Sequence, residues 1–369
     1  MLKAPSSYRN RILLITDLYP INNESTLPLA IENFVLALKD FDFKVTVIRP
    51  NFLFNTLIRK HKIYKQGVYQ RNDIKIYNIN FLLPFLNSNF IPEEDFDLII
   101  SHMPSGNIYA DLLNKKLKLP HISIVHRSDY EVLNDFKYGF YFKNRLKKAL
   151  NNSDFVGARN CNLFKKLNAD FILPSFIEKE FILNKKQAKE ELKLITISRL
   201  IKRKNIDMVI FSLKNLKKDF KYDIYGEGND RKRLENLIKK CNLQDKIKIH
   251  GQINHNLISE KLDGADIFIL PSKNETFGLC YLEAMARGLI TIAKKSESMD
   301  NIIQHGKSGF LIENSQDIKK ILENLTLQKK QEIINNTLEN IKNYEKERVI
   351  ENYIENINKT CNLIQKQNR

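Results

Sequence analysis

The sequence predicts an α/β protein of two domains, each built on a doubly wound parallel β-sheet. At 369 residues the chain exceeds the size at which one hydrophobic core usually keeps growing, so two domains are the default. Short apolar runs typical of buried strands alternate with helical patterns, which indicates parallel sheets. This series starts a second time after a polar and charged stretch at 178–191. We therefore expect an N-terminal domain at 1–180 and a C-terminal domain at 190–345.

The elements of the first half follow one another in the order expected of such a sheet. Residues 11–16 form an apolar run typical of a buried strand, and a loop at 17–26 follows it. The next segment places four apolar residues at helical spacing between Ile31 and Leu38. Further strand candidates lie at 44–48, 74–77, 97–100 and 121–125.

The second half repeats the alternation and adds a helical end. Its strand candidates lie at 194–197, 222–225, 247–250, 267–270, 289–292 and 309–312. The C-terminal segment, 327–368, interleaves charged and apolar residues, which predicts helices that pack on a surface.

The composition says more about the class of protein than about its activity. The net charge of +17 and the pI near 9.5 favour an anionic partner, but the basic residues are spread along the chain. No apolar run approaches the ~20 residues needed to span a bilayer. The N-terminal apolar run, Ile12 to Ile15, is too short for a signal peptide, so we expect a cytoplasmic protein. The four cysteines show no close Cys or His pairing that would predict a zinc site.

The most informative segment runs from Asp266 to Gly288. A four-residue apolar strand is stopped by Pro271, and a short polar loop leads into a helix. A helix N-terminus that follows a buried strand favours anions, because its free N–H groups and its dipole point at the ligand. Glu275 and Glu283 stand eight positions apart, on the order of 12 Å along a helix. That separation is too long for a hydrolytic carboxylate pair.

The spacing Glu275-x7-Glu283, with Phe277-Gly278-Leu279 inside it and 284–288 after it, resembles the donor-site signature of retaining GT-B glycosyltransferases, family 4 in particular. The resemblance implies two Rossmann-like domains facing each other across a cleft, with the nucleotide sugar bound by the second domain and the acceptor by the first. It also implies that a last helix, about 350–369, packs back on the first domain. By the same resemblance Glu275 lies beside the donor sugar and Glu283 binds the ribose. Backbone N–H groups hold phosphate or sugar oxygens at Thr276, Phe277, Gly278 and Leu279.

The loop after the strand at 194–197 resembles the family segment that binds the diphosphate. In Ser198-Arg199-Leu200 and the following Lys204-Asn205, Arg199 and Lys204 match the two cations, and Ser198 replaces the usual Gly. Arg supplies a bidentate fork and Lys a point charge. Lys202 and Arg203 are interpreted as solvated. Two further loops, implied to line the nucleotide pocket, contribute Gly226, Gly228, Gly251 and Ile253.

In the first half the segment 125–129 resembles the His-Gly-x-Asp segment of the family, with Arg127 in place of a small residue. The resemblance places His126 near the donor sugar, although a core or capping histidine would fit the same pattern. Asp129 is assigned to the acceptor side, with a helix-capping role as the alternative. Asn22 and Glu24 occupy the position where relatives carry a Gly-rich loop and are also assigned to the acceptor side.

The resulting hypothesis is a retaining hexosyltransferase that uses a UDP- or GDP-sugar and needs no metal or other cofactor. Its acceptor is a saccharide or a lipid-linked saccharide in the synthesis of lipopolysaccharide, capsule or glycoprotein glycans. The segment 137–148 interleaves four aromatic and five basic residues, which suits an anionic membrane surface or, equally, a helix with a buried aromatic stripe. A sugar-nucleotide epimerase of the same fold is the alternative. A basic nucleic-acid-binding protein is the third hypothesis, and the sequence lacks its module signatures.

Overall fold

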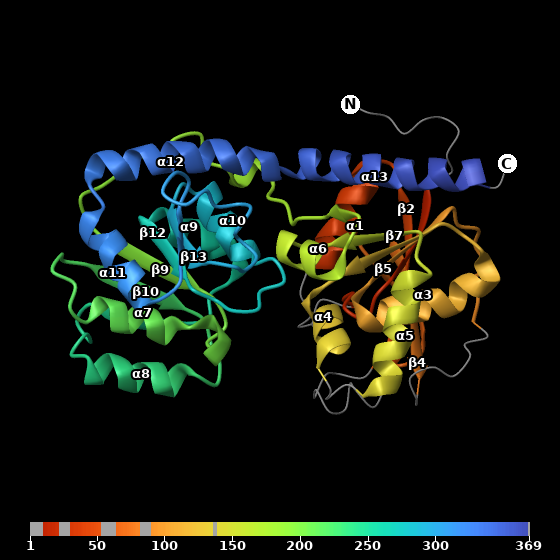
Figure 1. Ribbon diagram of the computed structural model, residues 1–369, viewed down its shortest axis with the longest axis horizontal. Coiled ribbons are helices and arrows are strands. Elements are labelled where there is room, and N and C mark those ends of the chain that lie inside the picture. The colour runs from red at the N-terminus through yellow and green to blue at the C-terminus, as the bar shows by residue number, and fades with distance from the viewer. Residues whose placement is uncertain (1–9, 22–29, 53–63, 82–89, 136–138, 368–369) are drawn as a thin grey trace. The chain divides into compact units, whose positions relative to one another are not determined.

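The computed structural model describes residues 10–21, 30–52, 64–81, 90–135 and 139–367, without the side chains beyond 359 (Figure 1). The chain forms two compact units. Unit 1 consists of residues 1–173 and 350–369, and unit 2 of Pro174–Val349. Within the described residues no helix is both long and apolar enough to cross a membrane.

Unit 1 is built on an eight-stranded sheet in the order β3-β4-β2-β1-β5-β6-β7-β8. Every strand pair is parallel except β3 and β4, which are antiparallel. A turn at Asn72 and Asp73 connects these two strands, and both residues have positive φ. From β4 onward the order is that of a Rossmann-like sheet. The strands are β1 (Arg11–Ile15), β2 (Lys44–Phe52), β3 (Gly67–Arg71), β4 (Ile74–Phe81), β5 (Leu98–His102), β6 (His121–Val125), β7 (Phe155–Ala158) and β8 (Phe171–Ile172).

Helices cover the sheet of unit 1, and the last helix of the chain joins them. They are α1 (Ala30–Asp40), α3 (Met103–Leu117), α4 (Arg127–Asn134), α5 (Phe140–Asn151), α6 (Cys161–Leu167) and the end of α13 (Lys346–Gln367). Tyr353 of α13 is buried, and its ring meets Phe34 of α1 edge-on at 5.0 Å. Figure 1 shows α13 beside α1, so the chain's C-terminal helix is part of the packing of unit 1.

Unit 2 contains a six-stranded parallel sheet in the order β11-β10-β9-β12-β13-β14, again the Rossmann order. Its strands are β9 (Lys193–Ile197), β10 (Lys221–Tyr225), β11 (Ile247–Gly251), β12 (Ile267–Leu270), β13 (Ile290–Lys294) and β14 (Phe310–Ile312). Its α-helices are α7 (Ile206–Leu213), α8 (Arg231–Lys240), α9 (Ile258–Asp263), α10 (Leu279–Ala286), α11 (Ser315–Asn324) and α12 (Leu327–Ile341). Short 3-10 helices include η3 (Lys202–Lys204) and η4 (His255–Leu257).

The strand order of unit 2 reverses between β9 and β12. The chain leaves β9 toward β10 on one side and returns to β12 on the other. In open α/β sheets ligands bind at the carboxyl ends of strands, beside such a reversal. The loops after β9 and β12 are therefore where the fold alone places a ligand site.

Candidate functional site

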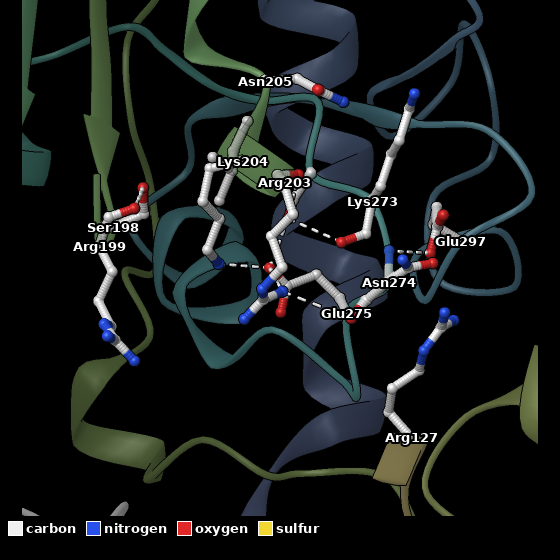
Figure 2. Close-up of polar contacts among 12 residues, drawn as sticks. Arg127, Ser198, Arg199, Arg203, Lys204, Asn205, Lys273, Asn274, Glu275 and Glu297 are labelled. Carbon is white, nitrogen blue, oxygen red and sulfur yellow. Dashed lines mark hydrogen bonds and ion pairs between the residues drawn. The ribbon is translucent and has the colours of Figure 1, made fainter. Parts of the chain in front are cut away.

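Glu275 is the centre of a buried polar group at the carboxyl ends of β9 and β12. Lys204, the last residue of η3, forms an ion pair with its carboxylate, and Ser272 donates a hydrogen bond to Oε1 at 2.6 Å. The side chains of Glu275 and Lys204 are only 9% and 10% exposed. Figure 2 shows Lys204 and Arg203 pointing at this carboxylate from the loop after β9.

Backbone and amide hydrogen bonds hold the two loops together. Asn205 donates its side-chain amide to the carbonyl oxygen of Pro271 at 2.8 Å. The N–H of Lys273 donates to the carbonyl oxygen of Arg203 at 2.8 Å. The carboxylate and its cations therefore stand on loops that are fixed to each other.

The charge of Glu275 is stabilised in spite of its burial. Burial alone raises the pKa of this carboxyl, but the attraction and hydrogen bond of Lys204, the hydroxyl of Ser272 and the charge of Arg203 together lower it below its usual value. Nη1 of Arg203 lies 3.4 Å from Oε1. Glu275 is therefore an ionised acceptor at neutral pH.

Arg199 differs from Lys204 in having no partner. Its side chain is exposed, and within the described part of the chain its guanidinium makes no hydrogen bond or ion pair. Figure 2 shows it extending from the same loop as Lys204, separate from Glu275. Of the two predicted cations, Lys204 is held in an ion pair with Glu275 and Arg199 is exposed.

The glycines after β10 are required by the close approach of two backbones. The N–H of Ser198 donates to the carbonyl oxygen of Tyr225 at 3.0 Å, and that of Leu200 to Glu227 at 2.8 Å. A Cβ at Gly226 would lie 1.8 Å from the carbonyl oxygen of Ser198. A Cβ at Gly228 would lie 2.1 Å from the carbonyl oxygen of Leu200. These glycines therefore fix the loop that carries Arg199.

Glu283 lies on α10, one turn after the helix begins, and is 7% exposed. Gly278 precedes the helix at φ +86°, which only glycine adopts without strain. Nε2 of His255, on η4, lies 3.5 Å from Oε1 of Glu283. A hydrogen bond with this carboxylate raises the pKa of His255, while burial opposes the shift.

The remaining predicted residues of unit 2 surround these groups. Phe277 is buried in the core beneath α10, and Ile253 packs against the same core. Gly251 accepts a hydrogen bond from the N–H of Gly226 at 2.7 Å. Leu279, the first residue of α10, is half-buried, and Thr276 precedes Phe277 in the loop.

In unit 1, His126 ends the loop after β6 and is the N-cap residue of α4. It is 9% exposed, and Nε2 lies 3.0 Å from Nδ1 of His102. Asp129 is fully buried, where it accepts hydrogen bonds from the N–H of His126 and from Asn107, both at 2.8 Å. Burial raises the pKa of Asp129 to about 8. Asp129 is the third residue of α4 and its carboxyl accepts the N–H of the N-cap residue, which is His126, so the alternative that Asp129 is itself the N-cap is wrong. The predicted Asn22 and Glu24 lie outside the described residues.

Comparison with known proteins relates unit 2 to one family of glycosyl transferases. Residues 178–348, nearly all of unit 2, match the family model described as glycosyl transferases group 1. By this match, unit 2 is a group 1 glycosyl transferase domain. An uncharacterized glycosyltransferase of Methanocaldococcus jannaschii is 28% identical over 334 residues, which are 85% of this chain and 88% of that protein.

Solved structures confirm the GT-B fold of this chain. HepE from Anabaena in complex with UDP-glucose matches 95% of this chain and 99% of its own, with a TM-score of 0.67 and 16% identity. A lipopolysaccharide outer core galactosyltransferase, WaaB, matches 94% of this chain and 99% of its own, with a TM-score of 0.71 and 13% identity. The predicted fold class, two Rossmann-like domains of the GT-B type, is confirmed.

Four contacts of this glycosyltransferase were not predicted from the sequence. Ser272 and Arg203 both reach Glu275, His255 reaches Glu283, and His102 reaches His126. Arg203 was interpreted as solvated; 42% of its side chain is exposed, but its guanidinium approaches the carboxylate. The contacts of Arg203, His255 and His102 join residues on different loops, so spacing along the chain gives no signal for them, whereas Ser272 and Glu275 stand three residues apart in one loop.

Within the described residues, no group of three or more His, Cys, Asp or Glu side chains is arranged to hold a metal ion. The two Asp residues at 95 and 97 instead bind the guanidinium of Arg11, at 3.4 and 3.3 Å.

Proposed function

We propose that the protein is a retaining glycosyltransferase that moves a hexose from a UDP- or GDP-sugar to a saccharide or lipid-linked acceptor. The observation that carries the proposal is the pair of fixed loops after β9 and β12. They present a free cation, Arg199, and an ionised buried carboxylate, Glu275, at the edge of the sheet where nucleotides bind.

Unit 2 contains a group of matching chemistry for each part of a nucleotide sugar. Arg199 would take the diphosphate through its fork of N–H donors. Lys204 would add a second positive charge from beside Glu275. The carboxylate of Glu283 would accept hydrogen bonds from the ribose hydroxyls. Glu275 would accept from a hydroxyl of the donor sugar.

Retention of configuration follows in this proposal from departure and attack on the same face. The acceptor hydroxyl attacks the anomeric carbon, the bond to the diphosphate breaks, and a leaving diphosphate oxygen takes the hydroxyl's proton. No protein base is required. Arg199 and Lys204 stabilise the charge that grows on the diphosphate, and one such donor is commonly worth about 3 to 4 kcal/mol. The mechanism calls on no metal ion.

The setting we propose is the synthesis of a cell-surface glycan at the cytoplasmic face of a membrane. The resemblance to a lipopolysaccharide galactosyltransferase supports a role in cell-surface glycan synthesis. The membrane location rests on α5. Its first residues, Phe140 and Tyr141, are 81% and 63% exposed, and its Lys147 and Lys148 are also exposed. Exposed rings together with basic side chains suit an anionic lipid surface.

The test begins with thermal unfolding in the presence of UDP-, GDP- and ADP-sugars. A donor that binds the folded protein raises Tm, because it is linked to folding. The selected donor is then used in a nucleotide-release assay with saccharide acceptors, and the anomeric configuration of the product is read by NMR. We expect a retained anomer and an Arg199→Ala variant with strongly reduced turnover.

The matched control is Lys202→Ala, which removes an exposed cation three residues after Arg199, at the start of η3. It should keep nearly normal turnover. Conversion of the nucleotide sugar to an isomer without any acceptor would contradict the proposal and favour an epimerase. An inverted product would contradict retention alone.

A further inference from the structure

Two histidines end adjacent strands of unit 1. β5 and β6 are parallel neighbours, with His102 opposite Ile124 in the register. His102 is the last residue of β5 and the N-cap of α3, and His126 follows β6 as the N-cap of α4. Both side chains therefore start from the carboxyl edge of the sheet, where α/β proteins bind ligands.

The backbone after His102 is strained. Met103 has φ +72°, a left-handed conformation that non-glycine residues rarely adopt and that costs on the order of 1 to 3 kcal/mol. The side chain of His102 forms no capping hydrogen bond to α3. α3 therefore begins without a side-chain cap and with a strained Met103. This combination indicates that the turn orients the His102 ring.

The ring points at His126. Nδ1 of His102 lies 3.0 Å from Nε2 of His126, and the ring centroids are 5.3 Å apart. His102 is 1% exposed and His126 9%, so His102 lies behind His126. The ring of Phe34, 5.8 Å from that of His102, packs on it from α1.

The pair is uncharged. Burial and the positive charge of Arg159 lower the pKa of His102 to about 3. Burial, His102 and Arg159 hold the pKa of His126 well below its usual value. Two neutral imidazoles carry one N–H each, so in this hydrogen bond one ring donates and the other accepts. The bond therefore couples the orientation and the protonated nitrogen of His126 to His102.

We infer that His102 is a positioning residue that acts on the transfer reaction only through His126, by fixing the orientation of its ring and which nitrogen carries the proton. The inference rests on the proposed function, because the family resemblance behind that function implies that His126 lies near the donor sugar. His102 itself touches no substrate in this assignment.

Two substitutions of His102 test the inference, and they differ in whether the side chain can form a hydrogen bond with His126. His102→Leu removes the ring nitrogen and keeps a side chain of similar bulk. His102→Asn places an amide close to the position of Nδ1, and an amide both donates and accepts. We expect His102→Leu to lower kcat about tenfold to a hundredfold, by analogy with the loss on removing a partner that orients a metal-ligating histidine. KM for the donor should change little, and His102→Asn should restore most of kcat.

A double-mutant cycle separates positioning from stability. If His102 acts through His126, adding His102→Leu to His126→Ala should change kcat no further. Losses that multiply in the double variant would overturn the inference. The matched control is His121→Leu, an equally buried histidine at the start of β6 that bonds Ser101 at 2.8 Å and not His126. It should lower Tm and leave kcat within about twofold.

A spectroscopic readout does not depend on turnover. With ¹⁵N-labelled histidine, the ring nitrogens of His126 should show one protonated nitrogen in the wild type and in His102→Asn. In His102→Leu they should shift toward a mixture of tautomers. Unchanged His126 signals in His102→Leu would overturn the inference even if no donor were ever found. Failure of every nucleotide sugar to bind, with coupled histidine signals, would instead count against the proposed function.

Discussion

Replacing Lys204 by Met should destabilise unit 2 by leaving Glu275 buried without its main counter-charge. Met keeps the length of the aliphatic stem and removes only the ammonium group. Removal of one member of a buried ion pair costs about 3 to 5 kcal/mol. Glu275 keeps the hydrogen bond from Ser272 at 2.6 Å and the guanidinium of Arg203 at 3.4 Å, so we expect the lower end, about 3 kcal/mol at pH 7.

The loss should depend on pH in a direction that identifies its cause. In the wild type the folded-state pKa of Glu275 is depressed, so ionised Glu275 contributes stability above the unfolded pKa. That contribution disappears as pH falls through the folded pKa. Without Lys204, burial dominates and raises the pKa of Glu275 above that of the unfolded chain. The variant's carboxyl then becomes neutral on mild acidification, and the difference between the two proteins shrinks below about pH 5.

Urea unfolding followed by far-ultraviolet circular dichroism at pH 7 and at pH 4.5 measures both effects. Lys202→Met is the control for loss of a basic side chain from η3, since Lys202 is exposed. Arg199→Ala should leave the free energy of unfolding unchanged, because Arg199 is unpaired, while turnover falls about a hundred- to a thousand-fold. A loss in Lys204→Met that is equal at both pH values would refute the electrostatic reasoning. No loss at all would show that the pair does not form.

Three further outcomes test other parts of the structure. Glu283→Ala should weaken donor binding about tenfold to a hundredfold in calorimetry, since each hydrogen bond to a charged group contributes about 1.5 to 3 kcal/mol; an unchanged Kd would remove this carboxylate from the nucleotide site. Gly226→Ala, whose methyl group would meet a backbone oxygen at 1.8 Å, should lower Tm clearly, whereas Gly264→Ala, with its nearest atom at 3.5 Å, should not; equal Tm values would contradict the close approach. The protein should sediment with anionic vesicles at low salt and be released at high salt, and a variant with Ser at Phe140 and Tyr141 should sediment less; a wild type that stays in the supernatant would exclude membrane binding.

Strands with both faces buried were predictable from the sequence. The predicted runs at 121–125 and 267–270 coincide with β6 and β12 residue for residue. Such strands read as continuous apolar runs because helices cover both faces of a parallel sheet. The edge strand β3 was missed, since its exposed residues, Val68 among them, break that pattern.

The site was predictable where one loop carries the chemistry, and not where two loops meet. Arg199, Lys204, Glu275 and Glu283 were found because each follows a strand at a recognisable spacing, and the structure places Lys204 against Glu275. Their assigned roles stay predictions. The contacts of Arg203 and His255 depend on how neighbouring loops fold over the sheet edge, which no local pattern encodes.

The two cations of the donor loop owe their difference to the partners that the fold gives each of them. The loop after β12 supplies Lys204 with a carboxylate, which holds its charge in place before any ligand binds. The loop after β10 meets the donor loop through its backbone, and its carboxylate, Glu227, pairs with Arg231 instead of Arg199. A charge fixed in advance stabilises a developing anion without reorganisation, and an unpaired charge gives a ligand its full attraction. The arrangement of glycines and carboxylates around one loop thus produces both kinds of cation within five residues of each other.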